Sequence, residues 1–178
     1  MSESHKAVGA DGARRSPSTS EVGTRKFPTR LFHETPPWVH PGVVFHLRVR
    51  CDRSNRRELT VPEIGSELLQ SVAFYHERQR WWVSLFLLMP DHWHGLISFP
   101  RAEDMSRVIG DWKRFQEKKH GIVWQEGYFD HRIRNEAEFQ LKADYIRNNP
   151  VVKQLCSSPS DWLWVFPKVD GDLRAPLF

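Results

Sequence analysis

The sequence predicts an α+β domain in which two helices cover one face of an antiparallel sheet. Segments in which apolar residues alternate with period two are interleaved with segments of helical period. The length of 178 residues, 39% of them hydrophobic, suits one domain with a single main core. The elements follow one another as strand, helix, strand, strand, helix, strand and helix. This order predicts a ferredoxin-like, split βαβ sheet with an added C-terminal helix.

The first strand is predicted at residues 43–50, VVFHLRVR, where side chains alternate cleanly between two faces. One face is apolar, and the other carries His46 and Arg48. A helix is predicted over residues 60–80, with Thr60 as its N-cap and Glu63 three residues later.

An apolar hairpin is predicted next, with WWVSLFLLM and HWHGLISF as its strands and Pro90-Asp91 as its turn. Residues 106–121 predict a second helix, closed by Gly121, with Val108, Trp112 and Phe115 facing the core.

The C-terminal part of the domain begins with VWQEGYFDHRIR, which predicts an irregular fourth strand. A third helix is predicted over residues 135–149 and is expected to stop at Pro150. The aromatic DWLW segment that follows, at residues 161–164, is expected to pack onto the domain, with base stacking as the alternative.

The expected organisation is a basic, disordered or loosely docked tail (1–35), one domain (36–165) and a C-terminal tail (166–178). Residues 1–59 contain 11 Lys and Arg against 6 Asp and Glu, a net charge of +5 within a total of +4. Nucleic acid is one partner that such an excess fits, and ordinary solubility is the other explanation. No stretch approaches the roughly 18 apolar residues of a membrane helix, and two cysteines are too few for a disulfide framework. We therefore expect a cytoplasmic protein without a membrane partner.

Two histidines, His92 and His94, flank Trp93 in the predicted hairpin. Residues i and i+2 of a strand share a face, so both imidazoles project side by side. Adjacent neutral imidazoles are a natural metal-binding pair, which needs a third ligand and an open position to be catalytic.

The third helix adds Tyr145 and Asn149, which lie one turn apart on one helix face. A tyrosine hydroxyl is a weak nucleophile at neutral pH, but a divalent cation that polarises a phosphate compensates for this. The amide oxygen of Asn149 is a candidate third metal ligand. The alternative is that Tyr145 is a packing residue and Asn149 a helix-end residue.

The ordered segments FLLMPDHWHGLI, WQEGYFDHRIR, YIRNNPV and DWLW resemble the single-tyrosine transposases of the insertion-sequence-200-like class. They are most similar to its REP-associated branch, over roughly residues 40–165. By that resemblance His92, His94 and Asn149 bind Mg²⁺ or Mn²⁺. Tyr145 then forms a 5′-phosphotyrosyl link with single-stranded DNA, next to a hairpin, and frees a 3′-OH. The class includes both monomers and homodimers, so either state is expected here.

Six further residues are candidate DNA contacts, and for most of them a solvated surface is the alternative. They are His46, Arg48, Lys113, Arg114, Arg132 and Arg134.

Two other functions compete with a transposase. One is a non-catalytic module that binds single-stranded nucleic acid on the same sheet face. The other is a metal-dependent hydrolase without a covalent intermediate, in which the histidines matter and Tyr145 does not.

Overall fold

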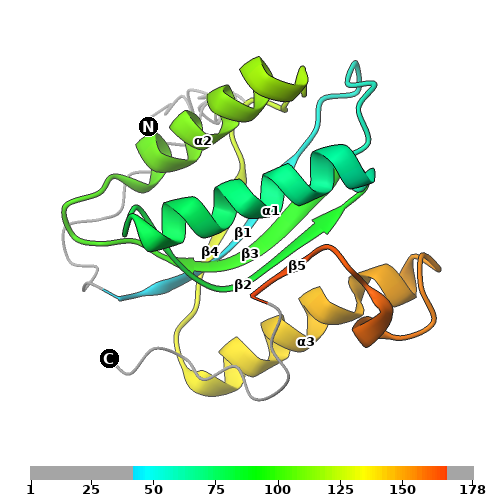
Figure 1. The fold of residues 1–178 in the computed structure, drawn as a ribbon. Helices are drawn as coiled ribbons and strands as arrows, with labels where there is room; N and C mark the ends of the chain where they lie inside the picture. The colour runs from blue at the N-terminus through cyan, green and yellow to red at the C-terminus, as the bar shows by residue number, and fades with distance from the viewer. Residues whose placement is uncertain (1–41, 168–178) are drawn as a thin grey trace, which may run out of the picture.

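The computed structural model describes residues 42–167, which form a five-stranded antiparallel sheet between two layers of helices (Figure 1). The elements are β1 (Val44–Arg50), α1 (Pro62–Glu77), β2 (Trp82–Met89), β3 (His92–Ser98), α2 (Met105–His120), β4 (Phe129–Arg132), α3 (Glu136–Val152), a 3-10 turn (Pro159–Asp161) and β5 (Val165–Phe166). The basic tail predicted at residues 1–35 lies outside the described residues. No helix of residues 42–167 is long and apolar enough to cross a membrane.

The strand order β4-β1-β3-β2-β5 confirms the predicted ferredoxin-like sheet and extends it by one short strand. Helices α1 and α2 cover one face of the sheet, and α3 lies on the opposite face (Figure 1). The sheet therefore has buried side chains on both faces.

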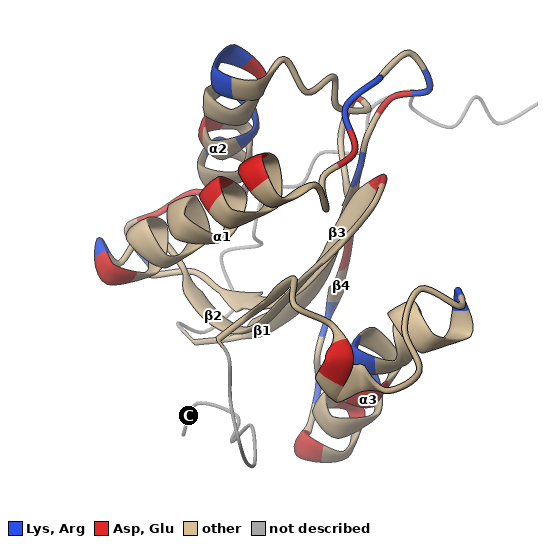
Figure 2. Cartoon of the chain, turned by 45° about the vertical axis from the view of Figure 1, so that its right-hand side comes forward, with Lys and Arg blue, Asp and Glu red and all other residues tan. Residues whose placement is uncertain are grey.

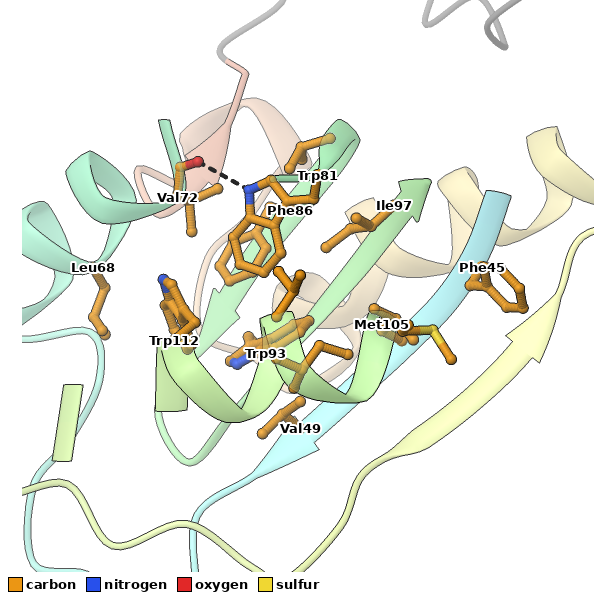
Figure 3. Packing of buried hydrophobic residues seen from close by; sticks show 14 of the residues in the cluster. Phe45, Val49, Leu68, Val72, Trp81, Phe86, Trp93, Ile97, Met105 and Trp112 are labelled. Atoms are coloured by element: carbon orange, nitrogen blue, oxygen red, sulfur yellow. Dashed lines mark hydrogen bonds between the residues drawn. The ribbon is translucent and has the colours of Figure 1, made fainter. Parts of the chain in front are cut away.

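The main core lies between the sheet and the α1–α2 layer, and tryptophans dominate it (Figure 3). The fully buried rings of Trp81, Trp93 and Trp112 meet there, and Phe86 stacks on Trp93 with 4.7 Å between ring centroids. The indole Nε1 of Trp81 donates to the carbonyl of Val72 at 3.1 Å. These three tryptophans are structural and are not available to stack on bases.

A smaller core under α3 joins the other sheet face to Phe139, Ala143 and Ile146 of that helix. The contact fixes the position of α3 against β2 and β3. It therefore determines where the side chains of α3 lie relative to the two histidines.

Two details of the predicted helices were wrong. Val61 is the N-cap of α1, with Pro62 in its first turn, and the hydroxyl of Thr60 instead donates to Glu58. Phe115 is 49% exposed because Gln116 takes the buried position one turn after Trp112. The Nε2 group of Gln116 donates to the Ser71 hydroxyl at 2.8 Å.

The prediction that Pro150 stops the third helix was also wrong, since α3 continues to Val152. Pro150 is buried, and the backbone N–H groups of Lys153 and Leu155 donate to the carbonyls of Asn149 and Pro150. The turn is therefore held on both sides of the missing N–H. As a result, Asn149 lies inside a regular helix and not in a frayed end.

The DWLW segment packs onto the domain, as predicted. The Trp162 indole donates to the Leu88 carbonyl at 2.8 Å, and the Leu88 N–H donates to the carbonyl of Trp164 at 2.9 Å. The Trp164 ring lies against Gly65 of α1, where a Cβ atom would come within 2.6 Å of it.

Candidate functional site

The histidine pair lies on β3, on the sheet face that α3 covers. Trp93 and Ile97 point into the α1–α2 core, whereas Leu96 packs under α3, which confirms the predicted alternation. In the register with β1, His94 lies opposite Arg48 and His92 opposite Arg50. Two arginines are therefore the cross-strand neighbours of the histidines on the β1 side, whereas Leu87 and Met89 are their neighbours on the β2 side.

The two imidazoles meet through their Nε2 atoms, which are 3.2 Å apart. Two nitrogens that are each about 2.1 Å from one cation, at an angle of about 90–110°, lie roughly 3.0–3.4 Å apart. The pair therefore has the spacing of two ligands of one metal ion.

Burial keeps these rings neutral. Desolvation, helped by the neighbouring His92 and His46, lowers the pKa of His94 to about 2. Desolvation also lowers the pKa of His92, although its contact with Asp91 opposes the shift. A neutral imidazole keeps the nitrogen lone pair that a metal ion requires.

Asp91 orients His92 and was not singled out from the sequence, where it read as a turn residue. Its Oδ1 lies 2.6 Å from His92 Nδ1, and its Oδ2 lies 3.4 Å from the Arg50 guanidinium. Partial burial raises the pKa of Asp91, but the hydrogen bond from His92 and the charge of Arg50 outweigh it and lower the pKa overall. The carboxylate therefore accepts a hydrogen bond from the Nδ1–H group, which leaves Nε2 of His92 as the atom with the lone pair.

His46 contacts His94 on the side of the ring opposite to His92. Its Nε2 lies 3.1 Å from Nδ1 of His94, and the ring is 4% exposed. The sheet and α3 thus enclose His46, which was predicted as a DNA contact. Desolvation, followed by the charges of Lys142, His131 and Arg48, lowers its pKa to about 4.

Tyr145 is brought to the histidines by α3. Its ring meets His94 edge-on at 5.8 Å and His46 at 6.2 Å between centroids, and the residue is 52% exposed. A side chain held against the metal-ligand candidates on one side and open to solvent on the other can receive a large substrate. This placement is what a nucleophile for DNA requires.

Asn149 lies one turn further along α3 and is 9% exposed. Its Nδ2 donates to the carbonyl of Tyr145 at 3.0 Å, so Oδ1 is the atom able to bind a cation. Within residues 42–167 no three His, Cys, Asp or Glu side chains are grouped to hold a metal ion. The amide oxygen of Asn149 is a possible ligand of another type.

Three more residues near His46 were not part of the predicted site. His131 lies opposite His46 in the β1–β4 register, and its Nε2 is 2.6 Å from a carboxylate oxygen of Glu138 on α3. Lys142 of α3 brings a positive charge close to His46. The register of β4 and the docking of α3 bring these residues to His46.

Of the predicted DNA contacts, Arg48 lies at the site, with its guanidinium 5.5 Å from the centroid of the Phe129 ring. Lys113 and Arg114 lie on α2, in the layer on the other side of the sheet. The Lys113 ammonium is held by the carbonyls of Gln125 and Gly127, at 2.7 and 3.1 Å, and Arg114 pairs with Asp111. The structure does not bring these two residues to the histidines.

Arg132 and Arg134, two of the candidate DNA contacts, do not share a strand face, because β4 ends at Arg132. Arg132 is the last residue of β4 and lies opposite Phe45, whose ring belongs to the α1–α2 core. It therefore points to the face away from His46. Arg134 follows the strand, and its backbone N–H donates to Glu138 at 2.9 Å.

Comparisons with known proteins find relatives in sequence and in fold. The family model described as "Transposase IS200 like" matches residues 44–149, which include all four predicted metal and nucleophile residues. A REP-associated tyrosine transposase of Escherichia coli K12 is 26% identical over 85 residues, 45% of this chain and 50% of that protein. The aligned part thus spans about half the length of that relative.

Among solved structures, that of a REP-associated tyrosine transposase bound to a REP hairpin has a TM-score of 0.62 at 22% identity. The match covers 80% of this chain and 94% of the other. It shows that the two chains share a fold. Because the family match covers more than half of the sequence, the chain belongs to the IS200-like transposase family.

Proposed function

We propose that the chain is a metal-dependent single-stranded DNA endonuclease and strand transferase, which cleaves next to a DNA hairpin through a 5′-phosphotyrosine intermediate. One observation carries the proposal. The half-exposed Tyr145 ring lies 5.8 Å from the ring of His94, whose Nε2 is 3.2 Å from that of His92. The proposed nucleophile and the proposed metal-ligand pair thus lie on one sheet face, in a chain of the IS200-like family.

His92 and His94 would hold Mg²⁺ or Mn²⁺ through their Nε2 atoms, with Oδ1 of Asn149 as the third protein ligand. When bound, the cation would supply Lewis-acid polarisation of the scissile phosphate. Asp91 and His46 contact the outer nitrogens of the two rings and hold them in one orientation.

In the chemical step, the hydroxyl oxygen of Tyr145 forms a bond to the scissile phosphorus, and the bond from phosphorus to the 3′ oxygen breaks. The hydroxyl proton passes to water, which the exposure of Tyr145 allows, and the 3′ oxygen leaves as a hydroxyl after taking a proton from water. One phosphoester replaces another, so no external energy source is needed. A different 3′-OH can attack the phosphotyrosine and rejoin the strand in the reverse reaction.

The partner that we propose is single-stranded DNA that contains a hairpin. The structural relative is bound to a REP hairpin, and the shared fold makes a similar substrate the first to test here. Tyr145 and both histidines lie together in one chain, which supports cleavage by a monomer, with a homodimer as the alternative.

The test is a covalent adduct between the protein and labelled DNA. Purified protein is incubated with Mn²⁺ and single-stranded hairpin oligonucleotides from its own genomic neighbourhood, then resolved on a denaturing protein gel. Tyr145→Phe should abolish the adduct and retain DNA binding. Tyr75→Phe and Tyr128→Phe are matched controls that should retain it, since both of these hydroxyls lie away from the histidines and burial raises the pKa of each.

Two outcomes would point to other functions. Cleavage that persists in Tyr145→Phe without an adduct would indicate a metal-dependent hydrolase. Binding without cleavage by the wild-type protein, with either metal and several hairpins, would indicate a non-catalytic binding module.

A further inference from the structure

A pocket of about 600 Å³ lies between the end of β1 and the start of α1, beside the histidine site. Four arginines line it: Arg50, Arg53, Arg56 and Arg57. No aromatic side chain is part of its lining. The pocket is therefore suited to an anion and not to a stacked base.

The loop that forms the pocket has a fixed shape. The carboxylate of Asp52 accepts hydrogen bonds from the backbone N–H and the hydroxyl of Ser54, at 2.8 and 2.7 Å. The side-chain oxygen of Asn55 accepts from the N–H of Val123 at 3.0 Å, which ties the loop to a distant segment. A site that is already formed binds its ligand without first ordering a loop.

The four arginines and three carboxylates of the pocket leave it with a net charge of +1. Its three carboxylates are engaged locally: Asp52 with Ser54, Glu58 with Thr60, and Asp91 with His92 and Arg50. Arg53, Arg56 and Arg57 are exposed, and none of them forms an ion pair with another described residue. Figure 2 shows blue segments, with red ones beside them, on the loop that leads from β1 to α1.

Asp91 joins the pocket to the histidine site. Its Oδ2 faces Arg50 of the pocket, while its Oδ1 holds His92. A DNA strand whose scissile phosphate lies at His92 therefore has the arginine pocket directly beside it.

We propose that this pocket binds the phosphodiester backbone of the substrate DNA next to the scissile phosphate. The guanidinium groups of Arg53, Arg56 and Arg57 bind phosphate oxygens, in the paired geometry that arginine favours. The proposal rests on the proposed function for the identity of the substrate, but its test measures binding and not cleavage.

The test compares two triple variants. In the first, Arg53→Ala, Arg56→Ala and Arg57→Ala remove the pocket charge. In the matched control, Arg78→Ala, Arg101→Ala and Arg107→Ala remove three exposed arginines near the end of α1 and the start of α2, away from the pocket. Fluorescence anisotropy in EDTA, from 50 to 300 mM KCl, measures the affinity for a labelled 20-nucleotide single strand and for a blunt hairpin.

Each phosphate contact on a single strand contributes about 0.7 to the slope of log affinity against log salt concentration. Three lost contacts should lower that slope by about 2 and weaken binding about 100-fold at 0.1 M salt. The control variant should keep the wild-type slope. Arg53→Lys, Arg56→Lys and Arg57→Lys together should keep the slope too, because the charges remain, which separates lost charge from a damaged fold.

A loss confined to the single strand would assign the pocket to unpaired backbone, and a loss on both probes would extend it to the hairpin stem. An unchanged slope and affinity in the pocket variant would overturn the proposal. Since binding is read without metal, the absence of an adduct in the wild-type protein would refute the proposed catalysis and leave this result intact.

Discussion

Replacing Asp91 with Asn should weaken metal binding without disturbing the fold. The carboxylate Oδ1 is 2.6 Å from Nδ1 of His92, a charge-assisted hydrogen bond, which is about twice as strong as a neutral one. Asn is isosteric and keeps a carbonyl oxygen, so the His92 ring should stay in place while its Nε2 becomes a weaker donor to a cation. Loss of such an outer partner lowers metal affinity about 10- to 100-fold, or roughly 1.4–2.7 kcal/mol.

Isothermal titration calorimetry with Mn²⁺ measures this effect directly. Glu58→Gln is the matched control, because Glu58 lines the same pocket but bonds Thr60 and not a histidine. The melting temperature of both variants should stay near that of the wild type, since Asp91 has a side chain that is 63% exposed. Equal Mn²⁺ affinities for the two variants would refute the idea that Asp91 tunes a metal ligand.

Three further predictions concern the histidines and the core. His46→Leu should lower the Mn²⁺ affinity about tenfold in calorimetry and leave DNA binding in EDTA unchanged. The reason is that the ring contacts His94 and is buried. Weaker DNA binding by the variant would indicate that His46 contacts DNA. In EDTA the free energy of unfolding should fall as the pH drops from about 6.5 towards 4. The fall should be up to about 1.4 kcal/mol per pH unit for each histidine whose pKa is lowered, because these histidines bind protons in the unfolded chain but stay neutral in the folded one. Urea titrations at several pH values check the sign, and a His46→Gln variant with the same slope as wild type would contradict it. Trp93→Ala should cost about 3–5 kcal/mol of stability in urea titration, since the ring is fully buried against Phe86; a loss below about 1 kcal/mol would contradict the described core.

The side chains that strand periodicity controls were predicted well. Period two alone puts His92 and His94 on one face and Trp93 on the other, because no long-range information is needed to know which way a strand residue points. The element order likewise allows few sheet topologies, and the ferredoxin-like order is among them.

The predictions failed where tertiary contacts determine how far a helix extends or which side chain is buried. Pro150 breaks an isolated helix, but its burial and the hydrogen bonds around it let α3 continue. Phe115 fits a helical stripe as well as Gln116 does, and only the Ser71 hydroxyl makes the polar residue the buried one. Asp91 and Lys142 join the site through a turn and a helix docking, which no single segment encodes.

The most direct test of the central claim is to identify the residue that becomes linked to DNA. Wild-type protein reacted with Mn²⁺ and a cleavable hairpin oligonucleotide is digested with nuclease and protease, and the modified peptide is mapped by mass spectrometry. The account predicts a nucleotide phosphate on Tyr145. A phosphate on Tyr75 or Tyr128, or cleaved DNA with no modified tyrosine, would contradict it.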